Sequence, residues 1–477
     1  MRSTVNRVLL VALFVLPFKL ESQFTAREYA DRRELLAGRV PDAVIVALGA
    51  PEPALDYLEF YQNPGMLYLT GITEPGAALV MVKEAGKASA TVFVLPRDPA
   101  AETWTGRRMG REGAARLTGL PARDRASLTR VLDSLGVGKL PFYVIGEISD
   151  SRKGDGPDDT LTPDEQYVAA FKRRHPQLRI SSGNDVLAEL RGKKTLAELA
   201  LIKRAVDITV SAQKEAIQAV RPDAYEYEIE ALIEYVFRRN GSERPSFATI
   251  VGSGPNSTTL HYNADDRQIQ KGDVVVMDIG ASYQGYAADV TRTVPANGIF
   301  SPEQRQIYQI VRDAQAAAER QAKLGAPAQL MSDSADAVLA AGLARLGLIE
   351  SPDATFESAR GGQQPQLRLY YMHGLGHGIG LEVHDPDQFY FTGTIAEGSA
   401  FTIEPGIYVR ENLLETLADT PKNRAMIARI RLAVDRYKNI GVRIEDDYVA
   451  TDKGVEWISR APREIAEIEA LMRRATP

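Results

Sequence analysis

Short apolar runs alternate with stretches of helical spacing along the first third of the chain. Four of these runs are typical of buried strands: Ala43–Gly49, Ala78–Val82, Thr91–Pro96 and Pro141–Glu147. Helix-like stretches lie between them, at Arg27–Ala37 and Arg125–Leu135. Strands that alternate with helices indicate an α/β domain. The segment Ser151–Thr160 is rich in Gly, Asp and Pro, so we predict a surface loop within this domain rather than its boundary.

The spacing becomes helical after Ser182–Lys194, where we predict the boundary between two domains. Thr195 and Glu198 form a capping box, which starts a helix by satisfying two backbone amides. The next apolar residues recur on one helix face: Leu199, Ile202, Val206 and Val210. The sequence therefore predicts an N-terminal domain over residues 23–185 and a C-terminal domain over residues 186–477.

Two further helices are predicted in the C-terminal domain. One begins at Asp223 and carries the apolar stripe Ile229, Leu232, Ile233 and Val236. The other opens with Ser301 as its N-cap and Pro302 at its first position, and it ends near Gly325.

A strand pair is predicted between these two helices. Asp273–Gly280 is apolar and β-branched, Ala281–Gly285 is the turn, and Tyr286–Val294 is the return strand. Asp278 and Asp289 are eleven positions apart, so a turn centred between positions 283 and 284 sets them directly opposite each other. A turn centred one place later leaves them diagonal neighbours on the same face.

Two aspartates on one apolar sheet face need compensation, because a buried charge is costly unless it is paired or coordinated. A salt bridge to an arginine such as Arg292 is one explanation, and a shared cation is a simpler one. Two strand-end glutamates extend the pattern. Glu404 ends an apolar strand within Ala400–Val409, before a Pro-Gly turn, and Glu445 has a similar place within Gly441–Thr451. Either glutamate alone could be a solvated strand end.

Three of the five histidines of the chain, His373, His377 and His384, fall within MHGLGHGIGLEVHD at 372–385. This Gly-rich stretch suits neither a helix interior nor an ordinary strand. A chance cluster in a loop is the plain alternative, but neutral imidazole is a common metal ligand and titrates near neutral pH. With the strand carboxylates, one histidine completes a set that could hold two divalent ions: Asp278, Asp289, His377, Glu404 and Glu445.

The composition limits the kinds of partner and metal site that the chain can have. The 477 residues are 44% hydrophobic and 25% charged, as in ordinary soluble globular proteins, and the net charge is −6 with both signs interspersed. This charge pattern argues against a nucleic-acid partner, which would need a basic face. The chain has no cysteine, so disulfides, thiol nucleophiles and thiolate metal sites are excluded. Any metal must be held by nitrogen and oxygen.

The N-terminus has the pattern of a secretory signal. Arg2 and Arg7 precede an eleven-residue apolar run, Val8–Phe18, which is shorter than the ~20 residues that span a bilayer. Ser22 is an acceptable small residue before a cleavage point, although Leu20 fits poorly. We therefore expect residues 1–22 to be a signal peptide and the protein to be periplasmic or extracellular, with a cytoplasmic location as the alternative. No stable membrane span is expected.

Several motifs of the chain together resemble those of a known family. The sequence resembles the aminopeptidase P branch of the pita-bread metallopeptidases in LHY at 260–262, VMDIG at 276–280, YAADVTRT at 286–293, MHGLGHGIGLEVHD, TIEPGIY at 402–408 and GVRIEDD at 441–447. The earlier stretches YLTGITEPGAALVM and AETWTGRRMG resemble the creatinase/aminopeptidase P N-terminal module. The resemblance implies an α/β (α+β) chain, in which a creatinase-like α/β domain precedes a pita-bread metallopeptidase domain.

The resemblance also implies a role for each matching residue. Asp278 would chelate one metal ion, Asp289 and Glu445 would bridge two, and His377 and Glu404 would complete the ligand set. The catalytic and substrate-facing residues would be His261, His373 and His384, with Glu404 as proton relay and Arg443 orienting a ligand carboxylate. Trp104, acting in a neighbouring subunit of a homo-oligomer, and Tyr408 would contact substrate.

The implied activity is that of a Xaa-Pro aminopeptidase, a metalloprotease that hydrolyses the bond before a proline at the second position. Two divalent ions would activate the attacking water, and carboxylate-rich ligands favour manganese, with zinc or cobalt as alternatives. The first rival is a proline dipeptidase acting on Xaa-Pro dipeptides. The second is a non-catalytic binding module on the same fold, which loss of ligands would reveal, whereas all five are present here.

One segment departs from the shortest family members. A long insertion separates Tyr408 from Gly441, and its apolar residues suggest a helix: Met426, Ile427, Ile430, Leu432 and Val434. Because it lies between two ligand strands, we expect it to overhang the cleft.

Overall fold

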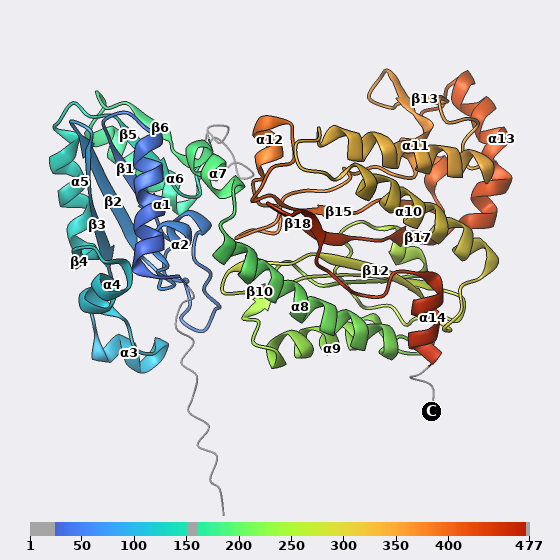
Figure 1. Cartoon of the computed structure of the whole chain (residues 1–477), viewed down its shortest axis with the longest axis horizontal. Helices are drawn as coiled ribbons and strands as arrows, with labels where there is room; N and C mark the ends of the chain where they lie inside the picture. The colour runs from blue at the N-terminus through green and yellow to red at the C-terminus, as the bar shows by residue number, and fades with distance from the viewer. Residues whose placement is uncertain (1–23, 150–159, 474–477) are drawn as a thin grey trace, which may run out of the picture.

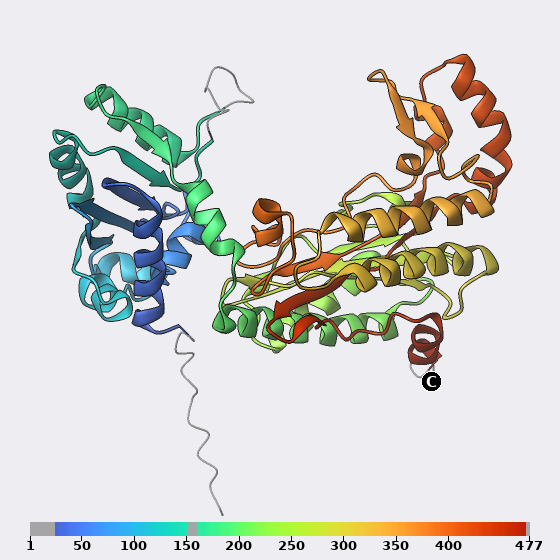
Figure 2. The same ribbon diagram turned by 45° about the horizontal axis from the view of Figure 1, so that its top comes forward.

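The protein has two lobes joined by a short helix, and Figures 1 and 2 show them on either side of it. This computed structural model describes residues 24–149 and 160–473. The predicted signal peptide and all but the last residue of the predicted loop Ser151–Thr160 lie outside these ranges. We refer to residues 24–182 as the N-terminal lobe and to residues 196–473 as the C-terminal lobe. The boundaries predicted at 185 and 186 remain predictions.

The N-terminal lobe is built on a six-stranded mixed sheet in the order β4-β3-β2-β1-β5-β6. The four predicted strands are confirmed within it, and the sheet comprises β1 (Ala43–Leu48), β2 (Ala78–Glu84), β3 (Lys87–Val94), β4 (Ala122–Asp124), β5 (Phe142–Ile145) and β6 (Ile180–Ser182). Both faces are covered by helices (Figure 1), which are α1 (Ala26–Arg39), α2 (Pro64–Thr70), α3 (Pro99–Thr105), α4 (Gly110–Thr118), α5 (Leu128–Gly136) and α6 (Pro163–Arg174).

The central strand β1 shows why these strands are continuously apolar. Val44 and Val46 pack into one core, with Phe171 of α6, whereas Ile45 and Ala47 pack into the core on the opposite face. A strand buried on both faces has no solvent-facing positions, so its sequence does not alternate.

The lobes are joined by α7 (Asn184–Gly192), which lies inside the predicted boundary segment, and the C-terminal lobe begins with α8 (Leu196–Ala219). The predicted capping box is confirmed, because the Thr195 side chain accepts from the Glu198 amide and the Glu198 side chain accepts from the Thr195 amide. One hydrophobic core contains side chains from both lobes, including Met66 and Leu69 with Ile202 and Ile379. The two lobes therefore pack against each other through a shared apolar core.

The C-terminal lobe places strands between two pairs of helices (Figure 2). On one side lie α8 and α9 (Glu226–Arg239), and on the other lie α10 (Pro302–Gln321) and α11 (Gln329–Arg345). The strands between them are β7 (Arg244–Pro245), β8 (Ile250–Ser253), β9 (Val274–Ile279), β10 (Ala281–Tyr283), β11 (Tyr286–Ala287), β12 (Val290–Pro295), β15 (Ala400–Ile403), β16 (Gly406–Val409), β17 (Ile440–Arg443), β18 (Asp446–Thr451) and β19 (Gly454–Trp457).

The peripheral elements of this lobe are shorter. They are β13 (Thr355–Glu357), β14 (Gln363–Pro365), α12 (Gln388–Thr392), α13 (Pro421–Tyr437), α14 (Ile465–Arg473) and the 3-10 turns η2 (Gly254–Thr258), η3 (Gln366–Leu369) and η4 (Leu413–Thr416). The N-terminal lobe adds one such turn, η1 (Arg125–Ser127), directly before α5.

Two helix ends differ from the sequence prediction. The helix expected from Asp223 begins three residues later, because Asp223 has a φ of 70°, a left-handed conformation that cannot start a helix. The helix that opens with Ser301 and Pro302 is confirmed at its start and ends at Gln321, four residues before Gly325. Helix ends carry weaker sequence signals than helix faces.

The insertion after Tyr408 contains the predicted helix, α13, which buries Met426, Ile430 and Val434 and exposes Leu432. Figure 2 shows α13 beside β13, at the end of the C-terminal lobe remote from the N-terminal lobe. No residue of 409–440 lines the cavity described below, so among the described residues the expected overhang is not seen.

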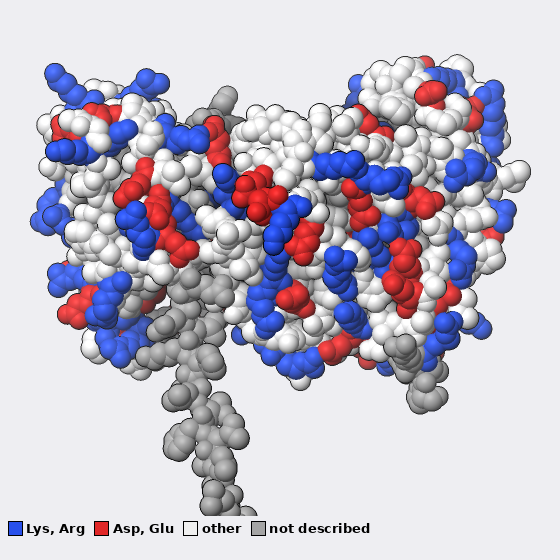
Figure 3. Space-filling view, in the orientation of Figure 1, with Lys and Arg blue, Asp and Glu red and all other residues white. Residues whose placement is uncertain are grey.

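Both charge signs are interspersed over the face of the two lobes that Figure 3 shows. Across residues 24–149 and 160–473, every helix is too short or too polar to span a bilayer.

Candidate metal and catalytic site

The first pair of carboxylates comes from the predicted hairpin. Ile279 pairs with Val290, and beyond a break Ser282 pairs with Ala287 in the same register. The turn is therefore centred one place later than the symmetric prediction. Asp278 lies opposite Thr291 and diagonal to Asp289, which is the second of the two predicted arrangements.

The second pair comes from a similar broken ribbon. Ile403 pairs with Asp446 on one side of the break, and Gly406 pairs with Arg443 on the other. Because the register is the same on both sides, Glu404 lies opposite Glu445. The predicted Pro-Gly turn after Glu404 is wrong, since Pro405 and Gly406 interrupt the ladder but do not reverse the chain.

Backbone contacts bring the two ribbons together. The Glu445 amide donates to the Thr291 carbonyl at 3.1 Å, and the Thr291 hydroxyl donates to Oε2 of Glu445 at 2.7 Å. The Asp289 amide donates to Oδ2 of Asp447 at 3.1 Å. Sequence reasoning missed Thr291 and Asp447. Their one available signal was position, since Thr291 lies two residues after Asp289 on the same strand face.

The histidine segment runs antiparallel beside β15. The amides of Thr402 and Glu404 donate to the carbonyls of His377 and Leu375 at 2.8 and 2.7 Å. A Cβ at Gly376 would collide with the Thr402 carbonyl, so only glycine allows this approach. Gly376 therefore lets the histidine segment pack directly against β15.

His377 points at the carboxylates. Its Nε2 lies 3.5 Å from Asp289 Oδ2, 3.6 Å from Glu404 Oε1 and 3.9 Å from Glu445 Oε1. Its Nδ1 lies 3.1 Å from the Gly378 carbonyl, so that nitrogen donates and Nε2 keeps its lone pair. This is the orientation of a metal-ligating imidazole.

The residues present fit a divalent cation. Potential ligand atoms of Asp289, His377 and Glu445 all lie within 4.8 Å of one another. Within the described residues, Oδ1 of Asp278, Oδ1 of Asp289 and Oε1 of Glu445 are buried without a hydrogen-bond partner. Buried carboxylate oxygens without partners are costly, and coordination of a cation would satisfy them.

The electrostatics support the same conclusion. Burial, and then the charge of Glu445, raises the pKa of Asp289 well above its ordinary value. Burial and Glu404 raise the pKa of Glu445 in the same way, and burial raises the pKa of Glu404 to about 8. Burial, with His384 as a smaller cause, lowers the pKa of His377 to about 4, which keeps the imidazole neutral at pH 7. Three crowded acids and a neutral imidazole are suited to a cation.

Arg443 lies behind the ligands. It pairs with Oδ2 of Asp278 and donates to the Thr291 hydroxyl at 3.2 Å, the Leu260 carbonyl at 3.2 Å and the Tyr408 hydroxyl at 2.9 Å. The contact with Asp278 agrees with the orienting role that the resemblance implied for this arginine.

Tyr408 is fully buried, and its hydroxyl lies 2.9 Å from Nε2 of His373. The His373 Nδ1 lies 2.8 Å from the Gly374 carbonyl and donates to it, so Nε2 accepts from Tyr408. The Tyr408 hydroxyl thus links Arg443 to His373, and Tyr408 is not among the residues that line the cavity described below. The predicted substrate contact of Tyr408 stays a prediction. Burial, with Arg443 as a smaller cause, lowers the pKa of His373 to about 4.

A cavity of about 520 Å³ opens over this centre. Besides the five candidate ligands and Arg443, it is lined by the three predicted substrate histidines, His261, His373 and His384. The His384 and His377 rings pack with centroids 4.1 Å apart. One wall is apolar, with Phe247, Ala248, Ile250 and Leu260. Sequence reasoning missed this feature because three of these residues belong to no motif and Leu260 only begins one.

Arg292 and Trp104, two further residues singled out from the sequence, do not line this cavity. Arg292 is fully buried, but it pairs with Asp446 at 2.7 Å rather than with Asp278 or Asp289, so it does not explain the aspartate pair. Trp104 lies on α3 and is 78% exposed, away from the cavity of its own chain. Its predicted contact in a neighbouring subunit remains a prediction.

We predict that metal loading releases protons. Because the Glu404 pKa lies near 8, metal-free protein at pH 7 holds this proton, and a ligand carboxylate must lose it. Titration calorimetry in two buffers of different ionisation enthalpy should show release, and the apparent affinity should rise with pH. Glu404→Gln should release fewer protons. Equal heats in the two buffers would contradict the prediction.

The raised pKa of Glu404 also predicts that the stability of the metal-free protein depends on pH. The folded pKa of Glu404 exceeds its ordinary value of 4.5, so the folded metal-free protein binds more protons than the unfolded chain between pH 4.5 and about 8. Its unfolding free energy should therefore fall as the pH rises through this range. Thermal melts of chelator-treated protein test this, and an added divalent ion should remove the fall.

Comparisons with known proteins cover both lobes. The model of metallopeptidase family M24 matches residues 200–452, and that of the aminopeptidase P N-terminal domain matches residues 29–139. A Xaa-Pro aminopeptidase from Haemophilus influenzae is 36% identical over 87% of this chain and 88% of its own length. A Xaa-Pro aminopeptidase from Escherichia coli is 32% identical over 94% and 98%. The structure of E. coli aminopeptidase P with the inhibitor Pro-Leu superposes with a TM-score of 0.78 at 30% identity, over 95% of this chain and 99% of that one.

Proposed function

The chain belongs to metallopeptidase family M24 and carries an aminopeptidase P N-terminal domain, and from this premise we propose that it is a Xaa-Pro aminopeptidase. It hydrolyses the peptide bond between an N-terminal residue and a following proline. One observation carries this function: a histidine and four carboxylates from two broken ribbons converge in one cavity, and three of their buried oxygens have no hydrogen-bond partner within the described chain.

The finer part of the proposal concerns the metal. Asp278, Asp289, His377, Glu404 and Glu445 would hold two divalent ions. Manganese suits a set dominated by carboxylates, and zinc and cobalt are the alternatives. When bound, such ions lower the pKa of a water molecule and polarise a carbonyl group.

The side chains of the chain supply the rest of the chemistry. Glu404 would take the proton of the attacking water and deliver it to the leaving nitrogen of the proline. Its Oε2 lies 3.6 Å from Nδ1 of His373, which also faces the cavity. His261 and His384 are exposed within the cavity and can donate to the developing oxyanion or to the leaving nitrogen. The apolar wall that includes Phe247 provides a surface for the proline ring.

The test is a comparison of three substrate classes with protein stripped by chelator and reloaded with manganese. Xaa-Pro-Xaa peptides should be cleaved after the first residue, and matched peptides with alanine at the second position should not. Cleavage of Xaa-Pro dipeptides alone would support the rival proline dipeptidase. Metal-dependent cleavage of the alanine peptides at the same rate as the Xaa-Pro-Xaa peptides would contradict the proposed specificity for proline.

We also propose export and self-association. The charged start and apolar run of residues 1–22 support secretion to the periplasm or outside the cell. The exposed Trp104 supports a homo-oligomer in which it reaches a neighbouring cleft.

We predict that mature protein from its native host lacks residues 1–22. Intact-mass spectrometry of the purified protein should give a mass that begins near Gln23. A chain that still carries Met1 and is recovered with cytoplasmic markers would contradict export.

A further inference from the structure

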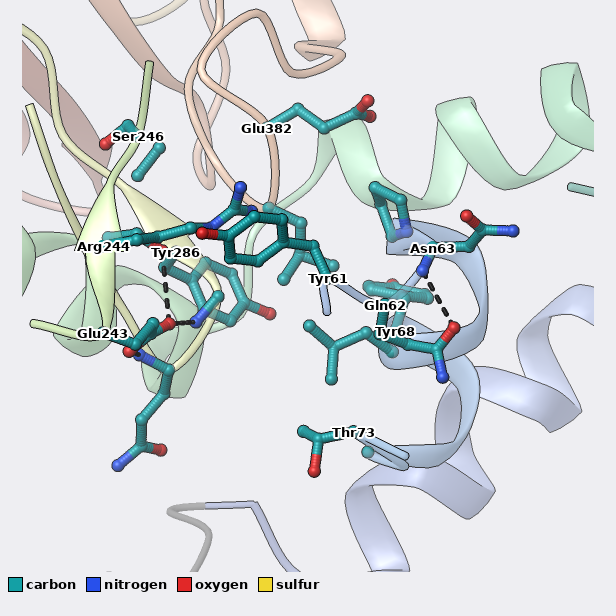
Figure 4. A pocket seen from close by; sticks show the side chains of 18 of the residues that line it. Tyr61, Gln62, Asn63, Tyr68, Thr73, Glu243, Arg244, Ser246, Tyr286 and Glu382 are labelled. Carbon is teal, nitrogen blue, oxygen red and sulfur yellow. Dashed lines mark hydrogen bonds between the residues drawn. The ribbon is translucent and has the colours of Figure 1, made fainter. Parts of the chain in front are cut away.

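The segment between His377 and His384 separates two cavities. Besides the metal cavity, a hollow of about 1090 Å³ lies between the two lobes, bordered by Tyr61, Arg244 and Glu382 (Figure 4). Val383 lines both cavities. The turn that carries Val383 and His384 is therefore a shared wall, and its position determines the shape of the catalytic side.

This turn closes around a buried carboxylate, that of Asp385. The Asp385 amide donates to the Gly378 carbonyl at 2.8 Å, and the Glu382 amide donates to Oδ1 of Asp385 at 3.2 Å. A Cβ at Gly380 would collide with Oδ2 of Asp385, so the backbone passes directly over the carboxylate. The conformation of residues 378–385 depends on that group.

Two cations that stabilise this carboxylate come from another part of the chain. Arg191 Nη2 pairs with Oδ1 of Asp385 and, at 2.7 Å, with Oε2 of Glu382. Lys194 Nζ lies 3.2 Å from Oδ2 of Asp385 and also donates to the Pro386 carbonyl. Arg191, Lys194 and Asp385 are all buried. Removing Arg191 leaves the Asp385 carboxylate paired with Lys194 through Oδ2 but removes the contact at Oδ1, so the buried group loses one of the two partners that fix its position.

The two cations are held by the junction of the lobes. Arg191 lies in the last turn of α7, whose Leu187 and Leu190 pack into the core shared by both lobes. The Lys194 amide donates to the Gly398 carbonyl at 2.9 Å, directly before β15. The cations are thus fixed by the docking of the lobes, on a segment remote in sequence from the catalytic motifs.

We propose that Arg191 and Lys194 are positioning residues for the catalytic turn, holding Asp385 so that His384 and Val383 face the metal cavity. The correct placement of His384 therefore depends on the junction of the two lobes. The expected loss of kcat rests on the proposed function, whereas the placement of His384 does not.

Arg191→Gln should lower kcat by up to about 100-fold, the cost of displacing a catalytic group by roughly 1 Å. The KM and the metal content should change little, because the five ligands are untouched. Arg191→Lys keeps the charge and should recover most of the rate. Lys194→Gln, which should act in the same direction, is the second variant if Arg191→Gln fails to fold.

A second readout does not require activity. The chain has five histidines, so ¹³C-labelled histidine gives few ring resonances. In metal-free Arg191→Gln at one fixed pH, the His384 resonance should shift, whereas that of His175, in the N-terminal lobe, should not. The resonance is assigned from its loss in His384→Ala.

Arg33→Gln is the matched control. Arg33 is as buried as Arg191, but it donates to the carbonyls of Leu69 and Thr118 at 2.9 and 3.0 Å, within the N-terminal lobe. It should lower the melting temperature while leaving kcat and the His384 resonance unchanged. Equal kcat losses in Arg33→Gln and Arg191→Gln, or an unshifted His384 resonance in Arg191→Gln, would overturn the proposal. If the wild-type protein fails to cleave Xaa-Pro peptides, the proposed function fails, and the resonance still decides the positioning.

Discussion

Asp289→Ala, and equally Glu445→Ala, is expected to abolish Xaa-Pro hydrolysis by removing one of the five proposed metal ligands. The loss in kcat should be at least about 10³-fold, since metal stabilisation of a transition state supplies several kcal/mol and each ~1.4 kcal/mol is tenfold. Elemental analysis of each purified variant, measured beside its turnover, should show less metal than the wild-type protein holds.

Loss of metal must be distinguished from loss of fold. Asp289→Asn removes one of the crowded carboxyls, so the metal-free variant should melt no lower than metal-free wild type. Asp164→Asn is the matched control, because Asp164 is buried in the N-terminal lobe and accepts from the Glu147 amide at 2.8 Å. It should lose stability but keep metal and turnover. Wild-type metal content with wild-type turnover in Asp289→Ala would refute the assignment.

Alanine substitutions of His377 and His384 should lower activity for different reasons, although the two rings are in contact. His377→Ala removes a ligand, so metal affinity and rate should fall together. His384→Ala leaves the ligands in place and removes a donor that acts when charge develops, so kcat should fall by ~10²–10³-fold with metal retained. Metal occupancy and turnover of both variants are compared at one manganese concentration.

The control for this pair is His175→Gln, in a histidine that pairs with Asp133 in the N-terminal lobe. It should keep both metal and turnover. If His384→Ala loses metal and His377→Ala keeps it, the two roles are reversed. Unchanged turnover in both would mean that this motif is not an active site.

The candidate site residues could be singled out from the sequence because each of them lies in a recognisable local pattern. Histidines among glycines and acids at strand ends are visible in the chain, and the spacing of Asp278 and Asp289 limited them to two arrangements, one of which is observed. The error at Pro405 has a physical reason. Pro-Gly is a common turn signal, but only the partner strand reveals that the ladder resumes in the same register.

Contacts between distant segments could not be predicted. The link from Arg443 through Tyr408 to His373 joins three motifs, each of which gave a residue but not its partner. The same holds for Arg191 and Asp385, which are 194 positions apart. Asp223 adopts a left-handed conformation that its residue type permits but does not require. Such features are set by tertiary packing, which a single sequence does not reveal.

The broken ribbons determine where this chain can change its length. A single-residue deletion within β15 or β18 would turn Glu404 or Glu445 to the opposite face, because side chains alternate along a strand. The connection between β16 and β17, residues 410–439, is free of that constraint, since Val409 still pairs with Ile440 although thirty residues separate them. This connection is therefore a suitable place for an insertion. A fluorescent reporter or an affinity tag inserted there should leave the ligand geometry intact, whereas one extra residue at either break should not.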